Sequence, residues 1–186
     1  MEGGVIILGL DVATKLGWAV YDTNKTPSSI ISGSIKLEGE NAFEKAQDMR
    51  RKLPKLIREH QPDFAAMEAP LEFAPQFKKT QRTLLGEEET TSTINSKTIA
   101  MLNRLAGAAQ MAVQGQNVRC IEVRPQTWQT IIPKTITGKP KQRAQQFCDM
   151  LKIVSPNMDS RDACIIAYWA VGHCQELKLL ERARAA

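Results

Sequence analysis

Cysteine and histidine are scarce in this sequence of 186 residues. No CxxC pair occurs, and no histidine stands at a zinc-ligand spacing from a cysteine. The residues concerned are Cys120, Cys148, Cys164, Cys174, His60 and His173. We therefore expect reduced thiols that act as small core side chains, and no zinc site.

Long apolar runs and phosphate-binding glycine loops are also absent. No stretch approaches the roughly 18 apolar residues of a membrane span, and the first residues lack the basic start of a secretory signal. We therefore expect a cytoplasmic protein with no membrane partner. Neither GxxxxGK[ST] nor GxGxxG occurs, which argues against a nucleotide cofactor. Without internal repeats or a low-complexity linker, residues 1–186 are expected to form a single domain.

The charge balance is positive, with 25 Lys and Arg against 20 Asp and Glu, a net charge of +5. This mildly favours a polyanionic partner. The candidate nucleic-acid-binding residues fall in two groups: Lys78, Lys79 and Arg82, and then Lys134, Lys139, Lys141 and Arg143. A solvated surface is the alternative for both groups. We favour the nucleic-acid interpretation for residues 139–143, because they precede an acidic helix.

The hydrophobic pattern alternates between strands and helices. Short apolar runs predict strands over residues 5–11, 18–21, 30–37, 63–68 and 118–123. Helical spacing predicts helices over 41–60, 96–116, 126–132, 144–151 and 159–177. Pro54 should kink or divide the first helix, and residues 14–17 are predicted to be a turn. We therefore expect an α/β fold with a five-stranded mixed sheet covered by helices on both faces, and an irregular insertion over 71–93.

Two of the predicted strands end in a carboxylate. Asp11 follows the apolar run of the first strand, and Glu68 ends the fourth. If these strands are parallel neighbours, both acids lie at the carboxyl-terminal edge of the sheet, where open α/β sheets place their sites. Alone, each acid has a simpler explanation, since Asp11 would suit a turn and Glu68 could pair with a surface lysine.

The last helix adds two acids three residues apart, Asp159 and Asp162. This spacing puts both on one helix face, which continues through Ala163 and Ile166. As an isolated pair they are better explained as a cap and a first-turn acid. Four converging carboxylates, however, are tolerable only with bound cations, and hard oxygen ligands select Mg²⁺ or Mn²⁺. A pair of such ions about 3.5–4 Å apart can drive phosphodiester hydrolysis.

The ordered set of these segments resembles the RuvC-type Holliday junction resolvases, possibly a phage or mobile-element member. Similar segments are Gly9-Leu10-Asp11, Gly17-Trp18-Ala19-Val20, residues 62–68, 102–107 and 122–129, Lys141-Gln142, and residues 159–163. The resemblance implies a ribonuclease H-like fold, two Mg²⁺ ions, a homodimer, and paired nicks across a four-way DNA junction. It makes Asp11, Glu68, Asp159 and Asp162 the catalytic metal ligands, and it places Lys141 at the scissile phosphate.

Two features depart from the family pattern, and several rival functions stay open. Residues 71–93 are an insertion, and Trp128 stands where a second basic residue is expected. One rival is a ribonuclease H-like nuclease acting on an RNA–DNA hybrid or on flap DNA. Another is a non-catalytic nucleic-acid-binding module of the same fold. An actin-like or sugar-kinase ATPase begins similarly, but it needs a second phosphate loop, which this chain lacks.

Overall fold

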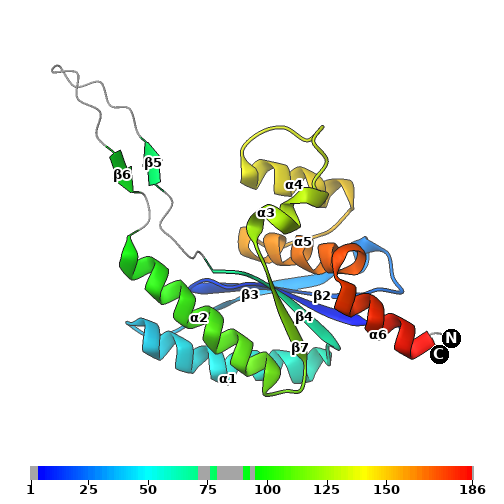
Figure 1. The fold of residues 1–186 in the computed structure, drawn as a ribbon, viewed down its shortest axis with the longest axis horizontal. Coiled ribbons are helices and arrows are strands. Elements are labelled where there is room, and N and C mark those ends of the chain that lie inside the picture. The colour runs from blue at the N-terminus through cyan, green and yellow to red at the C-terminus, as the bar shows by residue number, and fades with distance from the viewer. Residues whose placement is uncertain (1–3, 71–75, 79–89, 93–94, 186) are drawn as a thin grey trace.

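The computed structural model describes residues 4–70, 76–78, 90–92 and 95–185, and its centre is a five-stranded sheet. The strands are β1 (Ile6–Asp11), β2 (Lys15–Asp22), β3 (Ile31–Lys36), β4 (Phe64–Glu68) and β7 (Arg119–Val123), in the order β3-β2-β1-β4-β7. The first three form an antiparallel meander, whereas β4 and β7 run parallel to β1. The predicted mixed sheet of five strands is confirmed (Figure 1).

Helices cover both faces of this sheet. On one face lie α1 (Ala42–His60) and α2 (Ser96–Gln114). On the other lie α3 (Pro125–Trp128), α4 (Pro140–Met150), α5 (Met158–His173) and α6 (Gln175–Ala185). Two short 3₁₀ helices, η1 (Pro27–Ser29) and η2 (Gln129–Ile131), complete the list. None of the helices in the described ranges is long and apolar enough to cross a bilayer.

Alternate side chains of each strand enter two separate cores. Along β1, Leu8 and Leu10 face α1 and α2, whereas Ile7 faces α5. In β4, Ala65 and Met67 pack on the α1 side, and Phe64 packs on the α5 side. This alternation follows from the two-residue period of a strand. It also means that odd positions of β1 and even positions of β4 belong to the α5 face.

Three local predictions differ from the structure. Residues 15–17 belong to β2 and are not a turn, because they pair with β1 on one side and β3 on the other. Pro54 lies inside an uninterrupted α1, where buried Met49, Leu53 and Ile57 hold both halves of the helix on the sheet. The final helix is interrupted at Cys174, whose backbone is extended and which separates α5 from α6.

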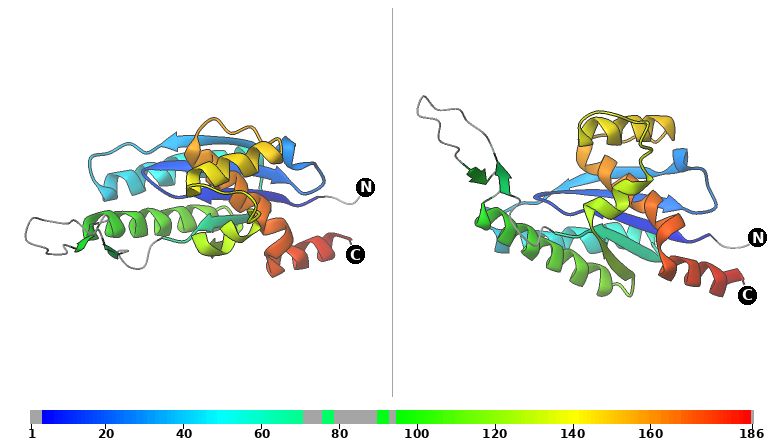
Figure 2. Two further views of the ribbon diagram at one scale, coloured as in Figure 1. Left: turned by 90° about the horizontal axis from the view of Figure 1, so that it is seen from above. Right: turned by 45° about the horizontal axis from the view of Figure 1, so that its top comes forward.

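The segment predicted as an irregular insertion contains regular structure. Strands β5 (Gln76–Lys78) and β6 (Thr90–Ser92) pair antiparallel in a small second sheet. They lie near the start of α2 and project from the main sheet (Figure 2). The rest of the predicted insertion, residues 71–75, 79–89 and 93, lies outside the described residues.

Candidate active site

Asp11 and Glu68 lie side by side at one edge of the sheet. Leu10 pairs with Met67 across the parallel strands β1 and β4, so the next residue of each strand is an acid at the same edge. The two-residue period directs both carboxylates to the α5 face. The prediction that the two acids share the carboxyl-terminal edge is therefore confirmed.

Two glycines let α5 approach this edge closely. A Cβ atom added to Gly17 would lie 2.0 Å from the carbonyl oxygen of Asp159, and one added to Gly9 would lie 2.2 Å from that of Ala163. No other residue leaves room for such contacts between a strand and a helix backbone. The missing side chains thus bring the first turns of α5, with Asp159 and Asp162, onto β1 and β2.

The start of α5 is also tied to the sheet by its cap. The Asn157 side chain accepts a hydrogen bond from the Ser160 amide (3.0 Å) and donates one to the Ser34 hydroxyl of β3 (3.0 Å). The cap is therefore Asn157, and Asp159 is an acid of the first turn. This corrects the alternative in which Asp159 itself capped the helix.

The carboxylates at this edge influence one another. Burial, and after it the negative charges of Glu68, Asp162 and Asp159, raise the pKa of Asp11 to about 8 against the opposing charge of Lys141. Burial likewise raises the pKa of Glu68 to about 7 and that of Asp162 to about 6. The structure therefore brings together all four predicted acids and Lys141.

Two of the acids have direct partners that the sequence did not predict. The indole Nε1 of Trp128 donates a hydrogen bond of 3.0 Å to Oε2 of Glu68. The Lys15 ammonium lies 3.3 Å from Oδ2 of Asp159. The sequence singled out Trp128 only because it stands where a second basic residue is expected, and it predicted a turn at Lys15. Because Trp128 is 60 residues from Glu68, no local pattern indicates that contact.

The four acids offer the hard oxygen donors that Mg²⁺ and Mn²⁺ prefer. Burial, with repulsion between neighbouring carboxylates, raises the pKa of Asp11, Glu68 and Asp162. Within the described ranges, however, no three Asp, Glu, His or Cys side chains converge closely enough to hold a metal ion together. The hydrogen bond from Trp128 and the ion pair with Lys15 direct two of the acids to other partners. The four carboxylates are therefore chemically suited to a divalent cation. Binding one would require their oxygen atoms to move closer to one another.

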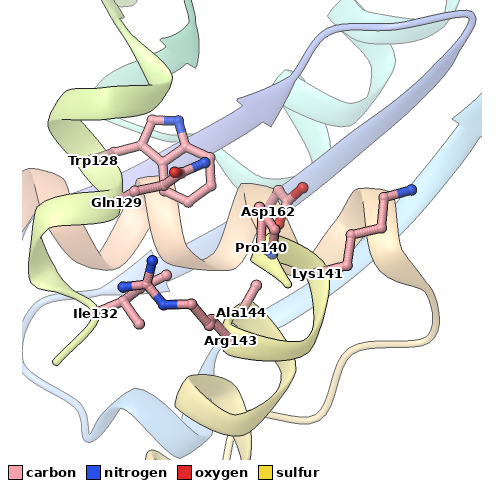
Figure 3. Close-up of a pocket in the computed structure, with 8 residues that line it drawn as sticks. All are labelled: Trp128, Gln129, Ile132, Pro140, Lys141, Arg143, Ala144 and Asp162. Atoms are coloured by element: carbon pink, nitrogen blue, oxygen red, sulfur yellow. The ribbon is translucent and has the colours of Figure 1, made fainter. Parts of the chain in front are cut away.

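A pocket of about 160 Å³ opens beside Asp162. Trp128 and Gln129 reach it from α3 and η2, and Lys141 and Arg143 reach it from α4 (Figure 3). The remaining lining residues are apolar: Ile132, Pro140 and Ala144. Positive groups, apolar walls and a carboxylate therefore meet next to the acid cluster.

Several solved structures share this arrangement of strands and helices. T. thermophilus RuvC in complex with a Holliday junction substrate aligns over 98% of this chain and 96% of its own, with a TM-score of 0.61 and 14% identity. A second Thermus thermophilus RuvC structure aligns over 90% and 93%, with a TM-score of 0.60 and 15% identity. The yeast mitochondrial Holliday junction resolvase aligns over 100% and 85%, with a TM-score of 0.57 and 15% identity. The chain has the RuvC-type fold.

Sequence comparison adds no further assignment, since no protein-family model and no curated protein matches the chain. The RuvC-type, ribonuclease H-like architecture inferred from the order of the motifs is nevertheless confirmed at the level of the fold. At identities of 14–15%, this likeness concerns the arrangement of the backbone and leaves the roles of individual residues as predictions.

The predicted basic residues occupy different parts of this RuvC-type fold. Lys134, Lys139 and Lys141 are exposed, in the segment before α4 and in its first turn. Arg143 is half-buried, and its Nε donates to the Ile136 carbonyl at 3.0 Å. Among the earlier group, Lys78 belongs to β5 without a described side chain, and Lys79 and Arg82 lie outside the described residues.

Proposed function

We propose that this protein is a metal-dependent endonuclease that cleaves phosphodiester bonds in branched DNA, with the four-way Holliday junction as its substrate. One observation carries the proposal. In a RuvC-type fold, Asp11, Glu68 and Asp162 lie half-buried at one sheet edge, and desolvation and mutual repulsion raise their pKa values. Such a cluster has an electrostatic cost that a divalent cation removes.

Two Mg²⁺ ions, for which Mn²⁺ can substitute, are the proposed cofactors. Asp11, Glu68 and Asp162 would hold them most directly, and Asp159 would complete the set after exchanging its ion pair with Lys15. Bound Mg²⁺ supplies Lewis-acid chemistry at a phosphate oxygen. Lys141, which already acts on Asp11 and Asp162 through its charge, would contact the scissile phosphate.

The DNA would cross the α4 side of the acid cluster. Exposed Lys134, Lys139 and Lys141 and the pocket with Arg143 lie there, and phosphate contacts of this kind orient a strand without reading its sequence. One of the similar RuvC structures contains a Holliday junction substrate, which supports branched DNA as the ligand. A nuclease for hybrids or flaps, or a non-catalytic module, becomes an outcome of the test below.

Paired nicks require two sites, and we propose that a homodimer supplies them. The exposed face of α2 is mixed: Gly107 and Met111, which is 67% exposed, lie among exposed Asn103 and Arg104, and a Cβ at Gly107 would meet nothing within 4 Å among the described residues. We propose that a second copy of the chain packs against this face, where Gly107 leaves room among the described residues, and sedimentation velocity at micromolar concentration distinguishes a dimer from a monomer.

The decisive experiment compares four substrates in parallel: a synthetic four-way junction, linear duplex, flap DNA and an RNA–DNA hybrid, each with and without Mg²⁺. We expect Mg²⁺-dependent paired nicks in the junction, and a loss of several orders of magnitude for Asp11→Asn with junction binding retained. Cleavage confined to the flap or hybrid would reject the junction assignment. Absence of any cleavage by a folded protein would favour a binding module.

A further inference from the structure

Trp128 combines a buried ring with a directed hydrogen bond. Its side chain is 2% exposed and belongs to the core between the sheet and α5. Core packing holds the ring on the side away from the pocket beside Asp162, and its N–H donates to Oε2 of Glu68 at 3.0 Å. The direction of this donor is therefore determined by the core and not by solvent.

The hydrogen bond from Trp128 makes the two carboxylate oxygens of Glu68 inequivalent. Oε2 is engaged by a neutral donor, and no Lys, Arg or His lies within 4.0 Å of this carboxylate in the part of the chain that the structure describes. A neutral N–H satisfies one oxygen without cancelling the negative charge. The second oxygen is then the one left to meet a cation.

We propose that Trp128 is a positioning residue that makes Glu68 bind a metal ion through a single oxygen, and thereby favours Mg²⁺ over Ca²⁺. This inference rests on the proposed function, because it assumes a cation at Asp11, Glu68 and Asp162. It adds a residue that touches neither metal nor DNA but selects between metals.

The physical basis is the difference between the two ions. Mg²⁺ is small, demands octahedral geometry and uses few carboxylates, whereas Ca²⁺ takes six to eight oxygens and accepts carboxylates through both oxygens at once. Because Oε2 of Glu68 spends one lone pair on the Trp128 hydrogen bond, whereas both lone pairs of Oε1 stay open, binding through Oε1 alone is favoured over binding through both oxygens. Hydrogen bonds that orient a metal ligand typically change metal affinity by about 10–100-fold.

The test measures Mg²⁺ and Ca²⁺ affinities by titration calorimetry on the full chain. Trp128→Phe removes the N–H and keeps an aromatic ring. Trp169→Phe is the matched control, because Trp169 is also buried and, among the described residues, its Nε1 has no hydrogen-bond partner. We expect Trp128→Phe to weaken Mg²⁺ binding by about 10–100-fold and Ca²⁺ binding by less, and Trp169→Phe to change neither.

A second variant separates the hydrogen bond from the packing. Replacing Trp128 by 3-benzothienylalanine exchanges the indole N–H for sulfur with almost unchanged shape, so the fold is retained even if phenylalanine leaves a damaging cavity. This variant should show the same loss of preference for Mg²⁺.

Three results would overturn the inference. Equal weakening of both metals by Trp128→Phe would mean that the ring acts only through packing if the 3-benzothienylalanine variant binds both metals normally, and that the N–H does not select between the two ions if that variant also weakens both equally. Unchanged affinities would mean that the N–H is irrelevant, although the nuclease proposal would survive. No Mg²⁺ binding by the wild-type protein would remove both the inference and the metal-dependent nuclease.

Discussion

Buried carboxylates serve opposite purposes at two positions of this protein. Asp48 in α1 is 3% exposed, and burial alone would raise its pKa. The Glu38 amide (2.9 Å) and Lys52 (2.8 Å) reverse that effect and lower the pKa. Asp11 has acids for neighbours instead, and its pKa is raised to about 8. Asp48 is thus stabilised by the donors around its carboxylate, whereas Asp11 has like charges beside it.

At the residue scale this contrast predicts a pH dependence. The folded protein holds protons on Asp11, Glu68 and Asp162 that the unfolded chain releases near pH 4. Their contribution to stability is therefore complete below about pH 4 and is lost as the pH rises towards 8. In metal-free buffer at pH 8, Asp11→Asn should be more stable than wild type, and at pH 4 the difference should vanish.

Thermal unfolding at several pH values measures this effect. A difference of about 2 kcal/mol would shift the melting temperature by about 4–8 °C for a chain of this size. Mg²⁺ should raise the melting temperature of the wild type at pH 8 and leave that of Asp11→Asn nearly unchanged. Asp48→Asn is the control with the opposite sign, since it should destabilise the protein at pH 8. A less stable Asp11→Asn at pH 8 would contradict the electrostatic account.

At the scale of elements, the site depends on how closely α5 lies against the sheet. The backbone of α5 occupies the space that side chains at Gly9 and Gly17 would need. The neighbouring core residues Ala163, Ile166 and Ala167 are fully buried and keep the helix in place. The separation of sheet and helix therefore determines where Asp159 and Asp162 stand relative to Asp11.

Gly17→Ala tests this dependence. The added Cβ would meet the Asp159 carbonyl oxygen at 2.0 Å, so α5 must shift, at a cost of about 1–3 kcal/mol in unfolding free energy. Because this shift moves Asp159 and Asp162 away from Asp11, nuclease activity and Mg²⁺ affinity should also decrease. Gly172→Ala in the same helix is the control, because its Cβ would meet nothing within 4 Å and stability should hold. Full Mg²⁺ affinity in Gly17→Ala would show that the acids bind the ion without the close contact between α5 and the sheet.

At the scale of the whole molecule, the exposed cations lie on both sides of the sheet but differ in their neighbours. Lys134, Lys139 and Lys141 accompany the acid cluster on the α4 and α5 side. Arg50 and Lys55 are exposed on α1, which covers the opposite face. We therefore expect the first group, and not Arg50 and Lys55, to contact a DNA strand whose phosphate reaches Asp11.

Changing Lys134, Lys139 and Lys141 together to Gln should weaken junction binding and flatten its salt dependence. Each lost phosphate contact lowers the slope of log K against log salt by about 0.9, so we expect a change of about 2–3. The measurement uses the Asp11→Asn background without Mg²⁺, so that binding is observed without cleavage. Arg50→Gln with Lys55→Gln removes two positive charges from the opposite face, and this control should leave the slope unaltered. An equal effect of both sets would move the DNA to another surface.

Much of the fold and the acid cluster followed from local patterns. Apolar runs that end in Asp11 and Glu68, and the helical stripe behind Asp162, are periodic signals that short segments carry by themselves. The parity of strand positions then determines which face the acids share. These features were predictable because they depend on burial, which the order of apolar and polar residues records.

Tertiary structure decided what those patterns cannot record. The bond from Trp128 to Glu68 and the ion pair from Lys15 to Asp159 join residues far apart in the chain, and they depend on which strands pair and how α5 lies on them. Pro54 remains helical because packing on both sides of it outweighs a local cost of about 3 kcal/mol. The sequence by itself thus determined the strands, the acids and their shared edge. Only the packed structure decided the partners of each acid, because hydrogen bonds and ion pairs between distant residues exist only after the chain has folded.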